Sequence, residues 1–273
     1  MKTNVVQLHE AVGTQAAAGT RPGFERLLFA LGMAGLGTLA LVYGDFAMVW
    51  QPVAPWVPGR TALAYGSGVL MLACGAGLPF AATVKWAARA LVVYLTAWAL
   101  LKVPAVVAVP QMEAVWLGLG ELTVLLAGGW VLFAKFGALD WGPLTGARGV
   151  KWAIALFGAS LLPIGLSHLI YAKPTYDLVP AWMPARVIWS YVTGVGQIAC
   201  GLGVLLRIWP RVAATAEAVM ISLFALLCWG PAIVITPKMR LGWTAFWISW
   251  AIASAAWVVA HEEWQRQRDR FNW

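Results

Sequence analysis

Long apolar runs, interrupted at intervals by polar and charged residues, dominate the pattern along the chain. A helix needs about 20 mostly apolar residues to cross the hydrocarbon part of a bilayer. The runs that meet this length with few charges are residues 27–44, 61–80, 85–104, 114–134, 152–171, 187–206, 212–235 and 241–260. The pattern therefore predicts an all-α, polytopic membrane protein with about eight transmembrane helices.

The third run is the weakest of these, because only twelve residues separate Arg89 from Lys102. A charged side chain inside the bilayer is costly, so both side chains would have to extend toward the two interfaces. Six or seven spans are the alternative to the eight that we expect.

Composition supports a membrane protein and excludes an ordinary soluble domain. Hydrophobic residues make up 61% of the chain and charged residues 11%, whereas soluble domains average about 45–50% and about 25%. The 18 Trp residues suit the membrane–water interfaces. The three Cys residues lie in apolar runs without a CxxC pair, which argues against a disulfide scaffold or a thioredoxin-type site.

The distribution of basic residues indicates how the spans are oriented. With the N-terminus inside, thirteen of the 19 Lys and Arg residues fall on the cytoplasmic side and six on the outer side. Cytoplasmic loops carry an excess of such residues. We therefore expect a multi-pass inner-membrane protein with both termini in the cytoplasm, a disordered tail over residues 1–23 and a basic tail over residues 262–273.

An internal duplication becomes visible when the chain is shifted by 126 residues. Residues 53–60 (VAPWVPGR) align with residues 179–186 (VPAWMPAR) without a gap. The same register pairs Trp56 with Trp182, Arg60 with Arg186, Tyr65 with Tyr191, Ser67 with Thr193, and Cys74 with Cys200. Chance similarity between apolar sequences would not preserve these residue types in one register.

Each copy contains four expected spans, so the chain returns to its starting side and both copies have the same orientation. We expect two four-helix bundles, residues 24–135 and 151–261, arranged as parallel repeats. A cytoplasmic linker over residues 136–150, rich in glycine, would join them.

The repeated segment supplies candidate site residues on the outer face. Its prolines disfavour continuous helix. The candidates are Trp56, Arg60 and Tyr65 in the first copy, and Trp182, Arg186 and Tyr191 in the second. They either anchor the protein at the lipid headgroups or form a lid over a small-molecule site that opens to the outer leaflet.

Ionisable residues within or beside the spans are candidates for a ligand or proton site, because charge in a membrane is costly. Asp45 and His168 lie near the outer ends of their runs, and Glu121 is the deepest of these groups. Glu121 is either part of a proton relay or in a structural ion pair with Lys102. His168 is either a hydrogen-bonded residue near the interface or a group that contacts a quinone carbonyl or moves a proton.

Several chemistries have no motif in the chain. There is no Cys/His cluster with metal-site spacing, no phosphate-binding glycine loop and no Ser-His-Asp arrangement. Nucleic-acid binding is not expected despite the net charge of +8, because the basic residues are spread over both faces. Enzymatic activity is left open; an enzyme of this kind would be part of a quinone-linked oxidoreductase.

Residues 165–169 (GLSHL), 178–184 (LVPAWMP) and 201–206 (GLGVLL), with Tyr191 and Gly194 between them, resemble the DoxX family of small four-helix membrane proteins. The resemblance implies one compact four-helix bundle per unit. Some members of that family are associated with quinone-linked sulfur oxidation or with thiol and oxidative-stress complexes. The family supplies no agreed catalytic residues.

The first unit lacks the histidine of this motif, and Val42 or Asp45 lies near its place. We expect a DoxX-like membrane subunit or scaffold, linked to quinone or thiol redox processes, with membrane lipid and protein partners in a membrane complex. No cofactor other than quinone is suggested. The alternative is a small-solute transporter or channel that uses the cleft between the repeats, with Glu121, Glu217 and Lys102 along its path.

Overall fold

The computed structural model describes residues 22–48 and 50–271; residues 1–21, most of the expected N-terminal tail, lie outside the described part. Within that part the chain is helical and contains no strand. The elements are α2 (Phe24–Tyr43), α3 (Arg60–Gly77), α4 (Val84–Ala108), α5 (Glu113–Phe136), η1 (Gly142–Leu144), α6 (Gly146–Ile170), α7 (Ala172–Leu178), α8 (Arg186–Leu205), α9 (Pro210–Phe224), η2 (Ala225–Trp229), α10 (Gly230–Ile235) and α11 (Arg240–Phe271).

Seven helical stretches are long and apolar enough to cross a membrane: α2, α4, α5, α6, α8, the continuous stretch Pro210–Ile235, and α11. The class predicted from the sequence, a helical multi-pass membrane protein, is therefore confirmed. Many large apolar side chains on these helices are exposed, among them Leu100 and Leu101 on α4. A bilayer would cover such side chains.

One of the eight expected spans is missing from this set, and it is not the third run, which the charges at Arg89 and Lys102 had suggested as the weakest. The helix α4 includes the weak third run and extends over 25 residues. Its Lys102 is buried rather than extended toward an interface, and it lies against α5, where a Cβ atom on Gly118 would come within 2.7 Å of Lys102 Nζ. The helix outside the set is α3, which has only 18 residues and contains several glycines.

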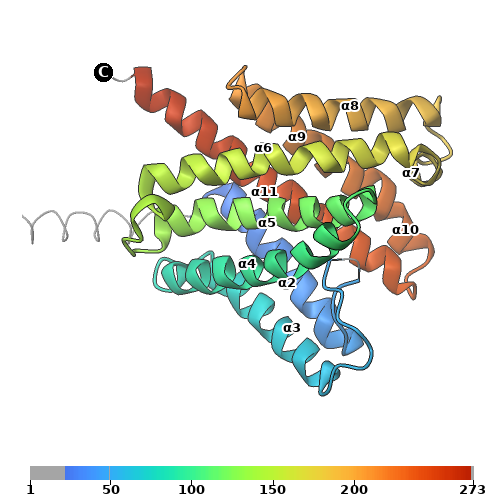
Figure 1. Cartoon of the computed structure of the whole chain (residues 1–273), viewed down its shortest axis with the longest axis horizontal. Coiled ribbons are helices and arrows are strands. Elements are labelled where there is room, and N and C mark those ends of the chain that lie inside the picture. The colour runs from blue at the N-terminus through green and yellow to red at the C-terminus, as the bar shows by residue number, and fades with distance from the viewer. Residues whose placement is uncertain (1–21, 49, 272–273) are drawn as a thin grey trace, which may run out of the picture.

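The helices pack around a central pair, α5 and α11, with α3 and α8 at opposite edges (Figure 1). Helix α2 packs on α3, and α6 packs on α8 in the same way. The halves also interlock, because α6 packs on α5 and α2 packs on α11. The buried apolar core runs without interruption through both halves.

Glycines allow the edge helices to approach closely. A Cβ atom on Gly37 of α2 would lie 2.7 Å from the carbonyl oxygen of Gly68 on α3. A Cβ atom on Gly165 of α6 would lie 2.6 Å from the carbonyl oxygen of Gly194 on α8. Close contact through small residues is how membrane helices gain packing energy in lipid.

The same crossings locate the counterpart of His168 in the first half. At the crossing of α6 and α8, a Cβ atom on Gly194 would lie 2.9 Å from the Cβ atom of His168. At the crossing of α2 and α3, a Cβ atom on Gly68 would lie 3.0 Å from the Cβ atom of Ala40. At these crossings Ala40 therefore occupies the place of the histidine, two positions before Val42, which the 126-residue register pairs with His168.

The two chain segments expected to be linker and tail contain more helix than the sequence indicated. Helix α6 begins at Gly146, within the expected linker, and α11 continues through Phe271. Ion pairs hold this end of α11 against its neighbours: Glu262 with Lys135 at 2.6 Å, and Glu263 with Arg207 at 2.6 Å. The partners belong to α5 and to the turn after α8, which are far from residues 262–271 in the sequence. A prediction from the local sequence of the tail could therefore not include these contacts.

Candidate functional site

His168 lies on α6 where this helix faces α8. Its Nδ1 atom is 3.0 Å from the hydroxyl oxygen of Thr193. The same hydroxyl also lies within hydrogen-bond distance of two carbonyl oxygens of its own helix, that of Trp189 at 2.8 Å and that of Ser190 at 3.0 Å. Which of the two side chains donates the hydrogen between them depends on the tautomer of the histidine ring.

An inner cavity of about 450 Å³ borders His168. It is bounded by α5, α6, α7, η2 and α11, and its polar lining includes Glu121, Ser167, His168, Thr175, Thr244 and Ser249. Glu121 and His168 come from neighbouring helices, and the structure brings them to one cavity. The Oε2 atom of Glu121 is buried and has no hydrogen-bond partner among the described residues.

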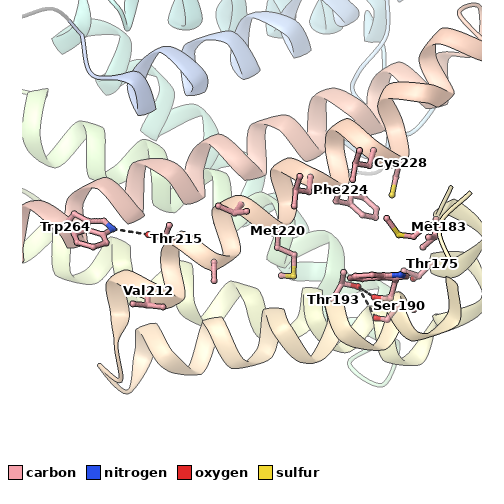
Figure 2. A pocket seen from close by; sticks show the side chains of 16 residues that line it. Thr175, Met183, Ser190, Thr193, Val212, Thr215, Met220, Phe224, Cys228 and Trp264 are labelled. Carbon is pink, nitrogen blue, oxygen red and sulfur yellow. Dashed lines mark hydrogen bonds between the residues drawn. The ribbon is translucent and has the colours of Figure 1, made fainter. Parts of the chain in front are cut away.

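A second hollow, the lateral groove, has a volume of about 720 Å³ and lies between α8 and α9 (Figure 2). Met220, Phe224 and Cys228 line one side, and Thr193 lies on the opposite helix (Figure 2). Its walls are almost entirely apolar. The groove and the inner cavity share Thr175 and Phe224. His168 lines the inner cavity and contacts two residues of the groove, Thr193 by its hydrogen bond and Phe224 by an edge-on ring contact.

The helix that carries Phe224 changes form at this point. Residues Ala225–Trp229 form a single turn of π-helix between α9 and α10. Pro231 has no N–H to donate to the preceding turn, which gives a local reason for the altered hydrogen bonding. Such turns occur frequently at functional sites, and the Gly230-Pro231 pair was the sequence signal for this one.

In the first half, side chains pack together between α3 and α4, the helices that align with α8 and α9 in the 126-residue register. There Gln51 donates to Ser67 at 3.1 Å and to Tyr94 at 2.5 Å, and Tyr94 packs edge-on against Trp98. In the 126-residue register Tyr94 aligns with Met220, and Trp98 aligns with Phe224. Two residues that line the lateral groove, Met220 and Phe224, thus align with a tyrosine and a tryptophan that are bulkier or stiffer.

The other buried charges are not gathered at this cavity. Lys102 is close enough to Glu121 to interact electrostatically, but it does not line the inner cavity. Glu217 is fully buried between α8 and α9, where its Oε1 accepts a hydrogen bond from Gln197 at 3.3 Å. Of the three residues expected along a transport path, Glu121 and Lys102 therefore lie near each other, whereas Glu217 is buried elsewhere, beside Gln197.

The tryptophans of the repeated segment are largely exposed, Trp56 at 82% and Trp182 at 68%. Tyr65 and Tyr191, in the second turns of α3 and α8, are about half exposed. This placement favours the anchor interpretation over a lid.

The arginines of the repeated segment hold its backbone. Arg60 Nε donates to the carbonyl oxygen of Val53 at 3.1 Å, and Arg186 Nε donates to that of Val179 at 2.7 Å. Each bond closes the loop that precedes a helix. Their guanidinium groups are therefore occupied by structural contacts, and neither arginine lines the inner cavity.

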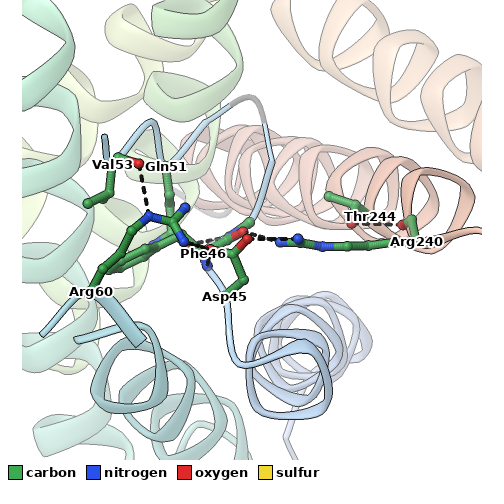
Figure 3. Close-up of polar contacts among 8 residues, drawn as sticks. Asp45, Phe46, Gln51, Val53, Arg60, Arg240 and Thr244 are labelled. Carbon is green, nitrogen blue, oxygen red and sulfur yellow. Dashed lines mark hydrogen bonds and ion pairs between the residues drawn. The ribbon is translucent and has the colours of Figure 1, made fainter. Parts of the chain in front are cut away.

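Asp45 connects the loop between α2 and α3 to Arg240 at the start of α11 (Figure 3). Its carboxylate pairs with Arg60 and, at 2.8 Å, with Arg240 of α11, which also donates to the carbonyl oxygen of Phe46. Partial burial opposes ionisation of Asp45. The hydrogen bonds from Arg240, the Phe46 N–H and Arg60 outweigh that effect and hold the pKa of the carboxyl below its usual value.

Together these features define a multi-pass helical membrane protein that has an apolar groove between α8 and α9 and, beside it, an inner cavity with a few polar groups to which helices of both halves contribute. A family model described as a domain of unknown function (DUF8561) matches residues 157–255. This span runs from α6 into α11 and includes His168, Thr193 and Phe224. No curated protein and no solved structure matches the chain.

Proposed function

We propose that this is a DoxX-like inner-membrane protein built from two tandem four-helix units, which binds a quinone-type ligand in the inner cavity and the lateral groove. The protein would serve as a membrane subunit or scaffold linked to quinone redox processes. It would have eight spans, with α3 as the shortest, and both termini in the cytoplasm. The position of His168 between the inner cavity and the lateral groove is the observation that carries this proposal.

Paired contacts support the tandem arrangement. The glycine contacts of α2 with α3 recur between α6 and α8, and the bond from Arg60 to Val53 recurs as the bond from Arg186 to Val179. Both helices that follow these loops are preceded by a residue with left-handed backbone, Gly59 at φ 67° and Ala185 at φ 54°. Two unrelated halves would not reproduce a glycine crossing, a loop closure and a helix start together.

The shapes of the two hollows fit a ligand with a ring and an apolar tail. Binding sites for small molecules are mostly apolar, with a few placed polar groups, and enclose about 300–1,000 Å³. The inner cavity offers Glu121 and His168 to a ring with oxygen substituents, and the lateral groove offers an apolar surface to its tail. The tail would pass Phe224, which borders both hollows.

A thiol-based role has less support. Cys74, Cys200 and Cys228 are free thiols, and the first two are buried. Neither Cys74 nor Cys200 borders the inner cavity or the lateral groove, which are the two hollows that the quinone interpretation uses.

The transporter alternative also has less support. The cleft that it requires would separate the halves near α5 and α11. A Cβ atom on Gly128 of α5 would lie 2.7 Å from the Cβ atom of Ala255 on α11, so these backbones are already in contact. We therefore retain one proposed function.

Quinone binding by the purified protein tests the proposal. Trp229 lines the inner cavity, and Trp189 and Trp264 line the lateral groove, so a bound benzoquinone should quench tryptophan fluorescence on titration. We expect His168→Ala and Thr193→Val to weaken binding at least tenfold. Ser67→Ala, at the aligned position of the first half, is the matched control and should bind normally. The proposal fails if the unaltered protein binds no quinone, or if all variants bind it equally.

A further inference from the structure

A basic pocket of about 280 Å³ lies where α9 begins. Three arginines line it, Arg207, Arg211 and Arg266, together with one acidic residue, Glu263. Arg207 binds both carboxylate oxygens of Glu263, at 2.6 and 3.0 Å, and so neutralises that charge. Arg211 has no carboxylate partner among the described residues. The lining therefore has an excess of positive charge that favours an anionic ligand.

The backbone at this point adds to the attraction for an anion. Arg207 and Trp209, which both line the pocket, have left-handed backbone at φ 60° and 47°, a conformation uncommon outside glycine. Pro210 and Arg211, the first two residues of α9, also line it. The first amide groups of a helix have no acceptor within the helix, and this end carries partial positive charge. The start of α9 thus supports the arginines in binding a phosphate group.

The basic pocket adjoins one end of the lateral groove. The guanidinium of Arg211 lies over the ring of Trp264, 4.7 Å from its centroid. Trp264 lines the groove and donates to the hydroxyl of Thr215, also in the lining, at 3.1 Å (Figure 2). Val212, the residue after Arg211, lies at the same end of the groove (Figure 2). A charged hollow and an apolar one therefore meet at the contact of Arg211 with Trp264.

The groove has the length and position of an acyl chain. Its lining follows α9 from Val212 to Phe224, which is about 18 Å at 1.5 Å per residue. One leaflet contributes about half of the roughly 30 Å of hydrocarbon in a bilayer. The stretch Pro210–Ile235 is long and apolar enough to cross a membrane, so its first residues lie at the interface and the groove lies at the depth of the lipid tails. The largely exposed Trp209 suits that interface.

From the junction of these two hollows we infer that the protein binds an anionic phospholipid, with its phosphate in the basic pocket and one acyl chain along the lateral groove. Guanidinium groups match phosphate oxygens with paired hydrogen bonds, and basic pockets between transmembrane helices bind lipid headgroups. A free phosphate would occupy only the pocket, and a neutral lipid would gain little from the arginines. The site is separate from His168 and does not depend on quinone binding. A long quinone tail would compete with the acyl chain, whereas a tail-less benzoquinone would not.

Native mass spectrometry of the purified, delipidated full-length protein measures this binding. The two lipid probes are dioleoyl phosphatidylglycerol and dioleoyl phosphatidylcholine, which have the same tails but differ in net charge. We expect one phosphatidylglycerol per chain to bind at least tenfold more tightly than phosphatidylcholine. Glycerol 3-phosphate and inorganic phosphate, which lack tails, should not displace the bound lipid even in large excess.

An arginine and a lysine at aligned positions provide the headgroup variant and its matched control. Arg211→Gln should weaken phosphatidylglycerol binding about fivefold, which corresponds to about 1 kcal/mol, the contribution of one basic side chain beside anionic lipid. Lys85 aligns with Arg211 in the 126-residue register, is exposed and lies outside the basic pocket and the lateral groove. Lys85→Gln should leave binding unchanged. Arg211→Lys keeps the charge and should lose less affinity than Arg211→Gln, which gives a second test if the glutamine variant is unstable.

Two exposed alanines provide a similar pair for the acyl chain. Ala216 of α9 lines the lateral groove, and Ala199 of α8 does not. Ala216→Phe places a ring in the groove, so it should weaken binding of both lipids at least fivefold and leave the preference for phosphatidylglycerol intact. Ala199→Phe adds the same ring outside the groove and should have no effect.

The outcomes separate this inference from the proposed function. Equal affinity for the two lipids, or equal losses in Arg211→Gln and Lys85→Gln, would overturn the inference. Displacement of the lipid by glycerol 3-phosphate would also overturn it, because the site would then recognise a soluble phosphate. If the lipid results are as expected and no quinone binds, the proposed function is wrong and the lipid site stands.

Discussion

Replacement of Gly165 by alanine tests the packing that holds His168 in place. The added Cβ atom would lie 2.6 Å from the carbonyl oxygen of Gly194, a backbone atom that cannot rotate away. Inserting a methyl group into a well-packed contact costs about 1–3 kcal/mol. For a chain of this size, 1 kcal/mol corresponds to about 2–4 °C in the midpoint of thermal unfolding, so we expect a decrease of about 2–12 °C.

The matched control is Gly66→Ala on α3. No atom lies within 4 Å of a Cβ atom at Gly66, and alanine favours helix over glycine by about 1 kcal/mol. The control should therefore be unchanged or more stable. The assay heats each variant in one detergent with a thiol-reactive fluorophore, which reports exposure of the buried thiols of Cys74 and Cys200. A Gly165→Ala protein as stable as the control would refute the close contact of α6 and α8.

Three further predictions concern the groove, the ion network and the topology. Met220→Tyr should fill the lateral groove and weaken binding of long-tailed quinones at least fivefold more than that of tail-less ones, as a tail-length series would reveal. Asp45→Asn should lower stability at pH 7 by about 1–3 kcal/mol. Because the pKa of Asp45 is lowered in the folded protein, its contribution to stability is complete above the ordinary carboxyl pKa of about 4 and is lost as the pH falls through the lowered value. The midpoint of thermal unfolding, measured from pH 7 to pH 2, should therefore fall less steeply for the variant than for the unaltered protein. Cysteines replacing Trp56 and Trp182, in a background without other cysteines, should react with an impermeant reagent from the same side of the membrane, and reaction from opposite sides would exclude parallel units.

Helix positions were largely predictable because the length of an apolar run is a local property. All eight expected runs are helical in the structure. The charges at Arg89 and Lys102 were a poor guide to which run is least suited to cross a membrane, since a partner helix can bury a lysine. Lys102 lies against α5 at a glycine, and this neighbour is not encoded near it in the sequence.

The candidate site was only partly predictable. His168 and Glu121 were both selected as single residues in a costly environment, but they are 47 positions apart and nothing local indicated a shared cavity. Their meeting depends on the crossing of α5 and α6, where a Cβ atom on Gly120 would lie 2.9 Å from the carbonyl oxygen of Ser160. The hydroxyls of Thr123 and Ser160, 2.7 Å apart, lie at the same crossing.

The chain by itself determined that this protein is helical and resides in a membrane, because the cost of placing apolar surface in water or charge in lipid depends on composition and run length alone. It also carried the repeated segment, whose prolines, tryptophan and arginine can be compared position by position. Only the tertiary structure decided that the halves interlock, that Ala40 stands in the place of His168, and that helices of both halves line one cavity. Those outcomes depend on how helices rotate and cross, which is set by contacts between side chains far apart in the chain.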